Sequence, residues 1–183
     1  PSTGGIVVIN TSNLNVSANG GKGGEITLNS SDGPIDFTNG GALNANAGGG
    51  NFQGGTISVT GTKISSGGVA ALSFTANGSG TGSGGTVTAV TTSNAIGDIT
   101  LGSGVGQVAI SAKSGSGAIG DGGIVTVNAA RNLTGDATQL DVSSVATNGS
   151  GGTINLNAGT KGPGHLQITG NINANGTGTG NGG

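Results

Sequence analysis

The sequence predicts an all-β protein that folds as a parallel β-helix, or β-solenoid, of about six coils with roughly 30 residues and three short strands in each. Three observations support this prediction. A glycine pair followed by alternating polar and apolar residues recurs along the whole chain. The recurrence has a period of about 30 residues, which is typical of repeat proteins. No segment has an apolar period of 3.6 residues that is long enough for a helix.

The glycine pair opens each copy of the repeated motif. In Gly54-Gly55-Thr56-Ile57-Ser58-Val59 apolar and polar side chains alternate, which is the pattern of a strand with one buried face. Because Gly meets no steric penalty at positive φ, we expect the pair to let the chain turn sharply before the strand. The copies are residues 23–28, 54–59, 84–89, 122–127 and 151–156.

Three families of short strands follow one another in each coil. The first comes after the glycine pair, the second after a short polar turn, and the third after the second. The inward candidates of the first family are Ile26/Leu28, Ile57/Val59, Val87/Ala89, Val125/Val127 and Ile154/Leu156. Those of the second are Val7/Ile9, Ile35/Phe37, Ile64, Ile99/Leu101, Leu133 and Leu166/Ile168. Those of the third are Leu14/Val16, Leu43/Ala45, Leu72/Phe74, Val108/Ile110, Leu140/Val142 and Ile172/Ala174.

The spacing of the third family locates an irregular part of the chain. Its members begin at positions 14, 43, 72, 108, 140 and 172, which are 29, 29, 36, 32 and 32 residues apart. The longest interval carries its extra residues around Asn94 to Gly106, where we expect a bulged loop. Gly4-Gly5-Ile6-Val7-Val8-Ile9 fits either the first or the second family, so both assignments stay open.

An antiparallel sandwich is the alternative fold, because turn signals every 8–12 residues or so are also present. A sandwich has no reason to repeat the same three-strand unit along the chain. In a parallel β-helix, equivalent strands of successive coils lie about 4.8 Å apart and need a common register, which the repeat supplies. One coil buries too little apolar surface to offset its ordering entropy, so we expect a single coil to be unfolded and several to be stable.

The composition excludes several classes of function. The chain has 44 Gly among 183 residues, three Phe as its only aromatic residues, and a net charge of −2. Its five cations are scattered, so no nucleic-acid partner is predicted. No run approaches the roughly 18 apolar residues of a membrane span. The absence of Cys excludes disulfides and thiol chemistry.

We expect residues 1–183 to form a single β-solenoid segment with uncapped ends. In the strand alignment, Pro1-Ser2-Thr3 lies in the loop before a second-family strand, and Gly182-Gly183 begins a further glycine-pair motif. Open solenoid ends expose unpaired backbone, which natural proteins cover. The sequence therefore predicts either an excerpt of a longer chain or a fibre subunit that stacks end to end.

No catalytic residue, cofactor or metal site is predicted. A glycan-cleaving enzyme needs clustered carboxylates, and no coil repeats an acid at the aligned position of its neighbour. Asp121, within Gly117-Ala118-Ile119-Gly120-Asp121-Gly122, is a single loose match to a calcium-binding β-roll motif, and the turn interpretation is favoured over a calcium ion. The single histidine, His165, has no second ligand in the pattern.

One outward-facing column is the candidate interaction face. The middle outward position of the first-family strand reads Thr27, Ser58, Thr88, Thr126 and Asn155. A flat row of hydroxyl groups is suited to binding ice or the face of a polysaccharide. Thr is also a good strand residue on any solvent-facing surface, so a plain surface is the competing interpretation.

The segment Gly170 to Gly183, together with the recurring Gly-Gly-Thr-Ile motif, resembles the repeats of very large bacterial surface proteins. These are the filamentous-haemagglutinin-like exoproteins and related β-strand-repeat adhesins, and the resemblance covers essentially the whole chain. It implies a right-handed parallel β-helix, secretion to the cell surface, and a role as adhesin shaft, matrix fibre or surface filament.

The sequence thus predicts a structural extracellular protein without catalysis, which associates with itself end to end or laterally. Surface glycans are a further candidate partner. Two alternatives belong to other classes. One is a carbohydrate- or ice-binding solenoid that uses the Thr/Ser/Asn face, and the other is a β-helix enzyme that degrades polysaccharides.

Overall fold

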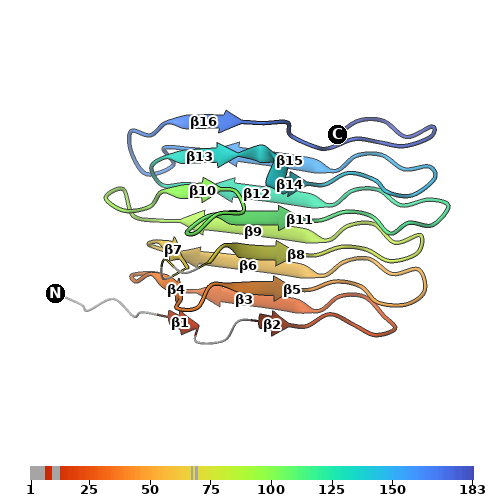
Figure 1. Cartoon of the computed structure of the whole chain (residues 1–183), viewed down its shortest axis with the longest axis horizontal. Coiled ribbons are helices and arrows are strands. Elements are labelled where there is room, and N and C mark those ends of the chain that lie inside the picture. Colours follow the sequence, from red (N-terminus) through yellow and green to blue (C-terminus); the bar gives the residue numbers. More distant parts are fainter. Residues whose placement is uncertain (1–6, 10–12, 67, 69) are drawn as a thin grey trace.

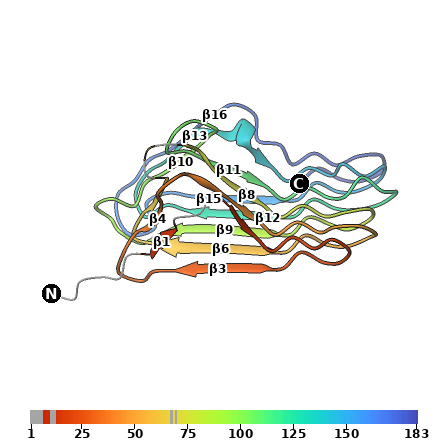
Figure 2. The same ribbon diagram turned by 60° about the horizontal axis from the view of Figure 1, so that its bottom comes forward.

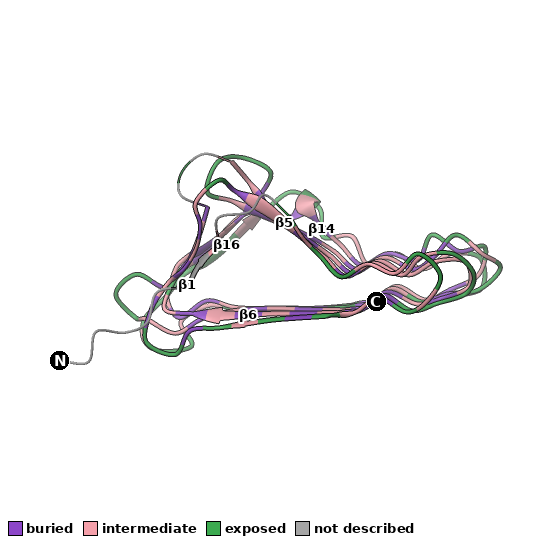
Figure 3. Cartoon of the chain, turned by 90° about the horizontal axis from the view of Figure 1, so that it is seen from below, coloured by how far each residue is buried: buried purple, intermediate pink, exposed green. Residues whose placement is uncertain are grey.

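The protein is a parallel β-solenoid in which successive coils stack along one axis (Figures 1 and 2). The structure is a computed structural model that describes residues 7–9, 13–66, 68 and 70–183. All pairings between its named strands are parallel. Viewed along the stacking axis, the chain winds as a right-handed coil from the first family through the second to the third (Figure 3). The predicted fold class is confirmed.

All three strand families are present. The first forms a five-stranded sheet of β3 (Glu25–Asn29), β6 (Thr56–Gly61), β9 (Thr86–Thr91), β12 (Ile124–Asn128) and β15 (Thr153–Asn157). The second comprises β1 (Val7–Ile9), β4 (Ile35–Phe37), β7 (Ile64–Ser65), β10 (Ile99–Leu101), β13 (Leu133–Asp136) and β16 (Leu166–Thr169). The third comprises β2 (Asn13–Asn15), β5 (Gly41–Asn44), β8 (Leu72–Thr75), β11 (Val108–Ser111) and β14 (Leu140–Asp141). A short 3-10 helix, η1 (Ala137–Gln139), precedes β14.

The prediction of six coils is slightly wrong, because the described chain makes about five. Six third-family positions were counted from the sequence, but a complete coil also needs a first-family strand, and the structure has five of these. The sixth third-family position, at Ile172 to Ala174, forms no strand and has only an isolated bridge from Asn173 to Asp141. The ambiguous segment at 4–9 is settled in its described part, since β1 pairs with β4 of the second family.

The core consists of side chains stacked on their counterparts in adjacent coils. The strand register places Ile57 between Ile26 and Val87, and continues through Val125 to Ile154. These residues are buried, apart from Ile154 in the last coil, which is half-buried. Figure 3 shows a triangular body enclosed by the three strand families. Inward side chains from all three families form one core cluster. Each coil buries a thin layer, so the stability of any layer depends on the layers above and below it.

The coil narrows where the third-family strand meets the next first-family strand (Figure 3). We call this region the waist. Across it, the second glycine of a pair donates an amide hydrogen bond to the carbonyl oxygen of the residue that ends the preceding third-family segment. The bonds are Gly24–Val16 (3.0 Å), Gly55–Ala45, Gly85–Ala76 and Gly123–Ala112 (2.7 Å each), and Gly152–Val142 and Gly183–Ala174 (2.8 Å each).

The expected role of the glycine pairs in a sharp turn is wrong. None of the pair glycines has a positive φ. They are needed because the chain passes too close to its neighbours for a side chain. A Cβ atom at Gly84 would overlap the carbonyl oxygen of Ala112, which is the acceptor of the waist bond in the next coil. A Cβ atom at Gly85 would overlap the carbonyl oxygen of Gly55 in the coil before.

Beyond the waist the chain forms a flat lobe, which contains residues 46–53, 77–83, 113–121 and 143–150 (Figure 3). Positive φ values occur here, at Gly49, Gly50, Gly80 and Gly120, where the chain reverses direction. The lobe exposes the side chains of Phe52, Ile119 and Val145, and hydrogen bonds between coils hold it together. The buried hydroxyl of Ser144, for example, donates to the carbonyl oxygen of Gly120 (2.8 Å).

Glycine substitutions at the waist test this packing. We expect Gly84→Ala to destabilise the protein by roughly 1–3 kcal/mol or more, because the new methyl group would displace a backbone hydrogen bond rather than a flexible side chain. Gly20→Ala is the matched control, since a Cβ atom there has no neighbour within 4 Å and Gly20 does not have a positive φ. Urea denaturation of both variants measures the effect. Equal midpoints would contradict the waist model.

Candidate functional site

The structure places the predicted interaction face in a single column. Strand register puts Thr27, Ser58, Thr88, Thr126 and Asn155 at the same position of adjacent first-family strands. All five point away from the core, and Thr27 and Asn155 at the two ends of the column are the most exposed. This set, the hydroxyl column, lies on the sheet that Figure 3 shows as the flattest wall of the coil.

The two neighbouring columns of the same sheet are mixed. One contains Thr56, Thr86 and Thr153, but also Glu25 and Ile124, which is 46% exposed. The other combines Thr60 and Val90 with three asparagines, of which Asn157 donates to Asn128 (2.8 Å). Hydroxyl groups therefore lie side by side mainly on β6 and β9, where the hydroxyl column runs next to the column that contains Thr56 and Thr86.

A second feature interrupts the otherwise regular stack. The strands β1, β4 and β7 form one sheet, whereas β10, β13 and β16 belong to the sheet of the third family. Among the described residues no pairing joins β7 to β10, although these are equivalent strands of consecutive coils. Their facing edges are consequently open.

The interruption results from the extra residues around β10. Instead of the single bulged loop expected at Asn94 to Gly106, the insertion forms two turns with β10 between them. In the second turn, Gly102 and Gly106 have φ values of 149° and 76°. The amide of Gly106 donates to the hydroxyl of Ser66 (3.1 Å), which ties this turn to the coil before it.

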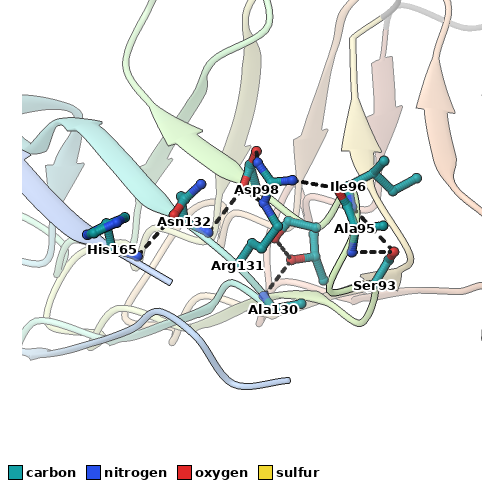
Figure 4. Close-up of polar contacts among 10 residues, drawn as sticks. Ser93, Ala95, Ile96, Asp98, Ala130, Arg131, Asn132 and His165 are labelled. Atoms are coloured by element: carbon teal, nitrogen blue, oxygen red, sulfur yellow. Dashed lines mark hydrogen bonds and ion pairs between the residues drawn. The ribbon is translucent and has the colours of Figure 1, made fainter. Parts of the chain in front are cut away.

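An ion pair holds the first turn in place (Figure 4). The Nε and Nη2 atoms of Arg131 donate to the two carboxylate oxygens of Asp98 at 3.0 and 2.9 Å, and Nη1 donates to the carbonyl oxygen of Ala95 at 2.5 Å. Asp98 Oδ1 also accepts the amide of Asn132 (3.0 Å), and Asn132 Oδ1 accepts the amide of His165 (3.0 Å). The Asp98 and Asn132 side chains thus each accept a backbone amide at the equivalent position of the next coil.

The base of the same turn depends on a buried hydroxyl. Thr91 is fully buried at the end of β9, donates to the carbonyl oxygen of Gly97 (2.6 Å), and accepts the amide of Ala130 (3.0 Å). Gly97 has no room for a side chain, because a Cβ atom there would overlap the carbonyl oxygen of Ser93. The sequence motif Gly97-Asp98 before an inward Ile99 is the signal that sequence reasoning missed.

A pocket of about 500 Å³ lies between the open edges of β7 and β10. Its base is formed by the buried side chains of Ile64, Ile99 and Val108. The exposed side chains of Lys63 and Ile96 lie at its rim. This is the size of a small-molecule binding site.

Several acidic side chains bind groups of a neighbouring coil. In the described part of the chain, no three His, Asp or Glu side chains gather where they could hold a metal ion. Asp121 Oδ1 accepts the amide of Ser150 (2.7 Å), which is a bond to the next coil like those of Asp98 and Asn132. Lys113 pairs with Asp141 at 3.4 Å on the third-family face.

Asp136 is the carboxylate with a displaced pKa. The backbone amide of Thr138, followed by the side chain of Thr138, lowers the pKa of Asp136 through hydrogen bonds to the charged form. The carboxylate caps η1. Because the pKa is lower in the folded state, the stabilisation from this cap is present above the unfolded pKa and is lost as the pH falls through the folded pKa.

No family model matches the chain, and no curated protein and no solved structure matches it. Within the described residues no helix is long and apolar enough to cross a membrane.

The role of Thr91 can be tested by a substitution of nearly equal shape. Thr91→Val should destabilise the protein by about 1–3 kcal/mol, since the buried amide of Ala130 loses its acceptor. Thr88→Val in the same strand faces outward and should be close to neutral. Chemical denaturation compares the two variants. A Thr91→Val variant as stable as the Thr88→Val variant would show that the hydroxyl does not hold the turn.

Proposed function

We propose that the chain is a structural module, a segment of an extracellular fibre or adhesin shaft that has no catalytic activity. The observation that supports this is the uniform register of the first-family sheet, in which five strands pair in parallel at matching positions. Such a stack has continuous backbone hydrogen bonding along its axis, which favours resistance to extension and proteolysis. Secretion to the cell surface, which the resemblance to surface exoproteins implies, is part of this proposal.

End-to-end association is part of this proposal. Leu166 in the last described coil is 53% exposed, whereas its counterpart Leu133 is fully buried beneath it. Ile154 and Leu156 are half-buried, whereas the matching residues Val125 and Val127 are fully buried. The outer strands β3 and β15 each have one edge without a partner strand among the described residues, and both carry the same alternating motif. A second copy stacked in register would bury this apolar layer and pair these edges.

Assembly of the purified chain tests this proposal. Leu156→Arg should weaken end-to-end association by at least tenfold, because it removes an apolar contact and places a charge in the stacking layer. Asn155→Arg on the outward side of the same strand is the control and should leave stacking unchanged. Sedimentation velocity over a concentration series and electron microscopy provide the measurement. A chain that stays monomeric at every concentration, or equal assembly of both variants, would refute stacking.

Carbohydrate or ice binding by the flat first-family face is the second candidate function. The alignment of the hydroxyl column on adjacent strands, with Thr56, Thr60 and Thr86 beside it, favours this candidate over the polysaccharide-degrading enzyme. Because neighbouring strands lie about 4.8 Å apart, the register repeats these side chains at a regular interval along the sheet.

The double variant Thr88→Tyr, Thr126→Tyr tests the second candidate. If the hydroxyl column binds a ligand surface, the two bulky rings should reduce adsorption to insoluble polysaccharide or to ice by at least tenfold, because they hold the surface away from the neighbouring hydroxyl groups. Ser73→Tyr on the third-family face is the control. A native chain that binds neither a glycan array nor ice would remove this function and leave the structural role unaffected.

A further inference from the structure

We infer that the pocket between β7 and β10 binds a sugar acid, that is, a monosaccharide or short oligosaccharide that carries a carboxylate. This site lies on the second-family side of the coil and is separate from the hydroxyl column and from the stacking ends. Its volume of about 500 Å³ exceeds what one sugar ring needs and lies within the range of small-ligand sites.

The walls of the pocket offer the hydrogen-bonding groups that a sugar requires. Since β7 and β10 are not paired with each other, the backbone N–H and C=O groups along their facing edges point towards the pocket. Side-chain oxygens of Ser65 and Thr100 lie on the same two walls. Ser65 already donates its hydroxyl proton to Asp36 (3.0 Å), so its oxygen is left as an acceptor for a ligand hydroxyl.

The accessible aliphatic surface of the pocket suits the apolar face of a sugar ring. Most of it belongs to Ile96 at the rim, which is 51% exposed, whereas Ile64, Ile99 and Val108 also line the pocket but are at most 7% exposed. A sugar ring has C–H groups on one face and hydroxyl groups around its edge. Aliphatic surface beside polar walls matches both, whereas a wholly apolar ligand would leave the strand edges unsatisfied.

The charges at the rim favour an anion. Lys63 forms no ion pair among the described residues, whereas the Arg131 charge is compensated by Asp98. The charged residues that line the pocket, Lys63, Arg131 and Asp98, sum to +1 in a chain of net charge −2. The Asp36 carboxylate, which accepts the Ser65 hydroxyl, does not line the pocket. The Asp98–Arg131 pair also keeps the first turn in place beside the site, so a carboxylate of the ligand has Lys63 as its partner.

Two substitutions at the exposed rim test the site without disturbing the core. Binding of glucuronate, galacturonate and N-acetylneuraminate is compared with that of glucose and galactose by ¹H–¹⁵N NMR titration. We expect at least one acid to shift the amides of Ile64, Ile99 and Thr100 and to bind at least tenfold more tightly than its neutral counterpart. Lys63→Gln should weaken that binding about tenfold and reduce its salt dependence, whereas Lys22→Gln, an exposed lysine far from the pocket, should not.

Ile96→Glu provides an independent test, because it adds a negative charge to the rim at an exposed position. It should weaken binding of the acid by a larger factor than binding of any neutral sugar, because both lose the contact with Ile96 but only the acid is repelled by the added charge. The inference is overturned if none of the acids shifts these amides, if acid and neutral sugars bind equally, or if Lys63→Gln binds like the native chain. Inorganic phosphate that binds more tightly than every sugar acid would assign the pocket to a simple anion and would also overturn it.

Discussion

The close approach of the backbone at the waist is the constraint on which the rest of the structure depends. Each coil closes when a glycine amide reaches the carbonyl oxygen of a residue across the waist, as Gly85 does with Ala76 at 2.7 Å. The first glycine of the preceding pair, Gly54, must also lack a side chain, because its Cβ atom would overlap the same carbonyl oxygen of Ala76. One contact therefore fixes two glycines in every coil, and the strands that follow them inherit the same register.

This constraint explains how a chain with only three aromatic residues forms an ordered protein. Phe37 and Phe74 form an aromatic contact in the core, with ring centroids 6.4 Å apart. Most other layers contain Ile, Val, Leu or Ala stacked on similar residues. Backbone ladders and side-chain bonds between coils, such as Asp98 to the amide of Asn132, complete the stack. Each coil is stabilised by its neighbours, so contacts between coils provide the stability that a large core provides in a globular protein.

Sequence periodicity predicted the strand families and their inward residues because alternation and recurrence are direct consequences of a repeated register. It could not reveal why the glycine pairs exist. A Gly demanded by positive φ and a Gly demanded by a neighbouring carbonyl oxygen look identical in sequence, and only the position of Ala112 next to Gly84 distinguishes them. The count of coils failed for a related reason, since the third-family pattern persists at Ile172 where no strand forms. The contact between Arg131 and Asp98 joins residues 33 positions apart, a separation that depends on an irregular insertion.

The interruption between β7 and β10 is informative because the rest of the stack is so regular. The first-family sheet continues through the same coils, with β6 and β9 paired over six positions. The insertion therefore changes strand pairing on one side of the coil and leaves the register on the other side unchanged. The irregular side has the open strand edges, the fixed ion pair and the unpaired lysine. A repeat protein can in this way confine a site with specific chemistry to one coil, while the remaining coils keep the uniform geometry that a shaft requires. The proposed mechanical and binding roles would use different walls of the same coil, so a substitution in one wall is expected to leave the other role intact.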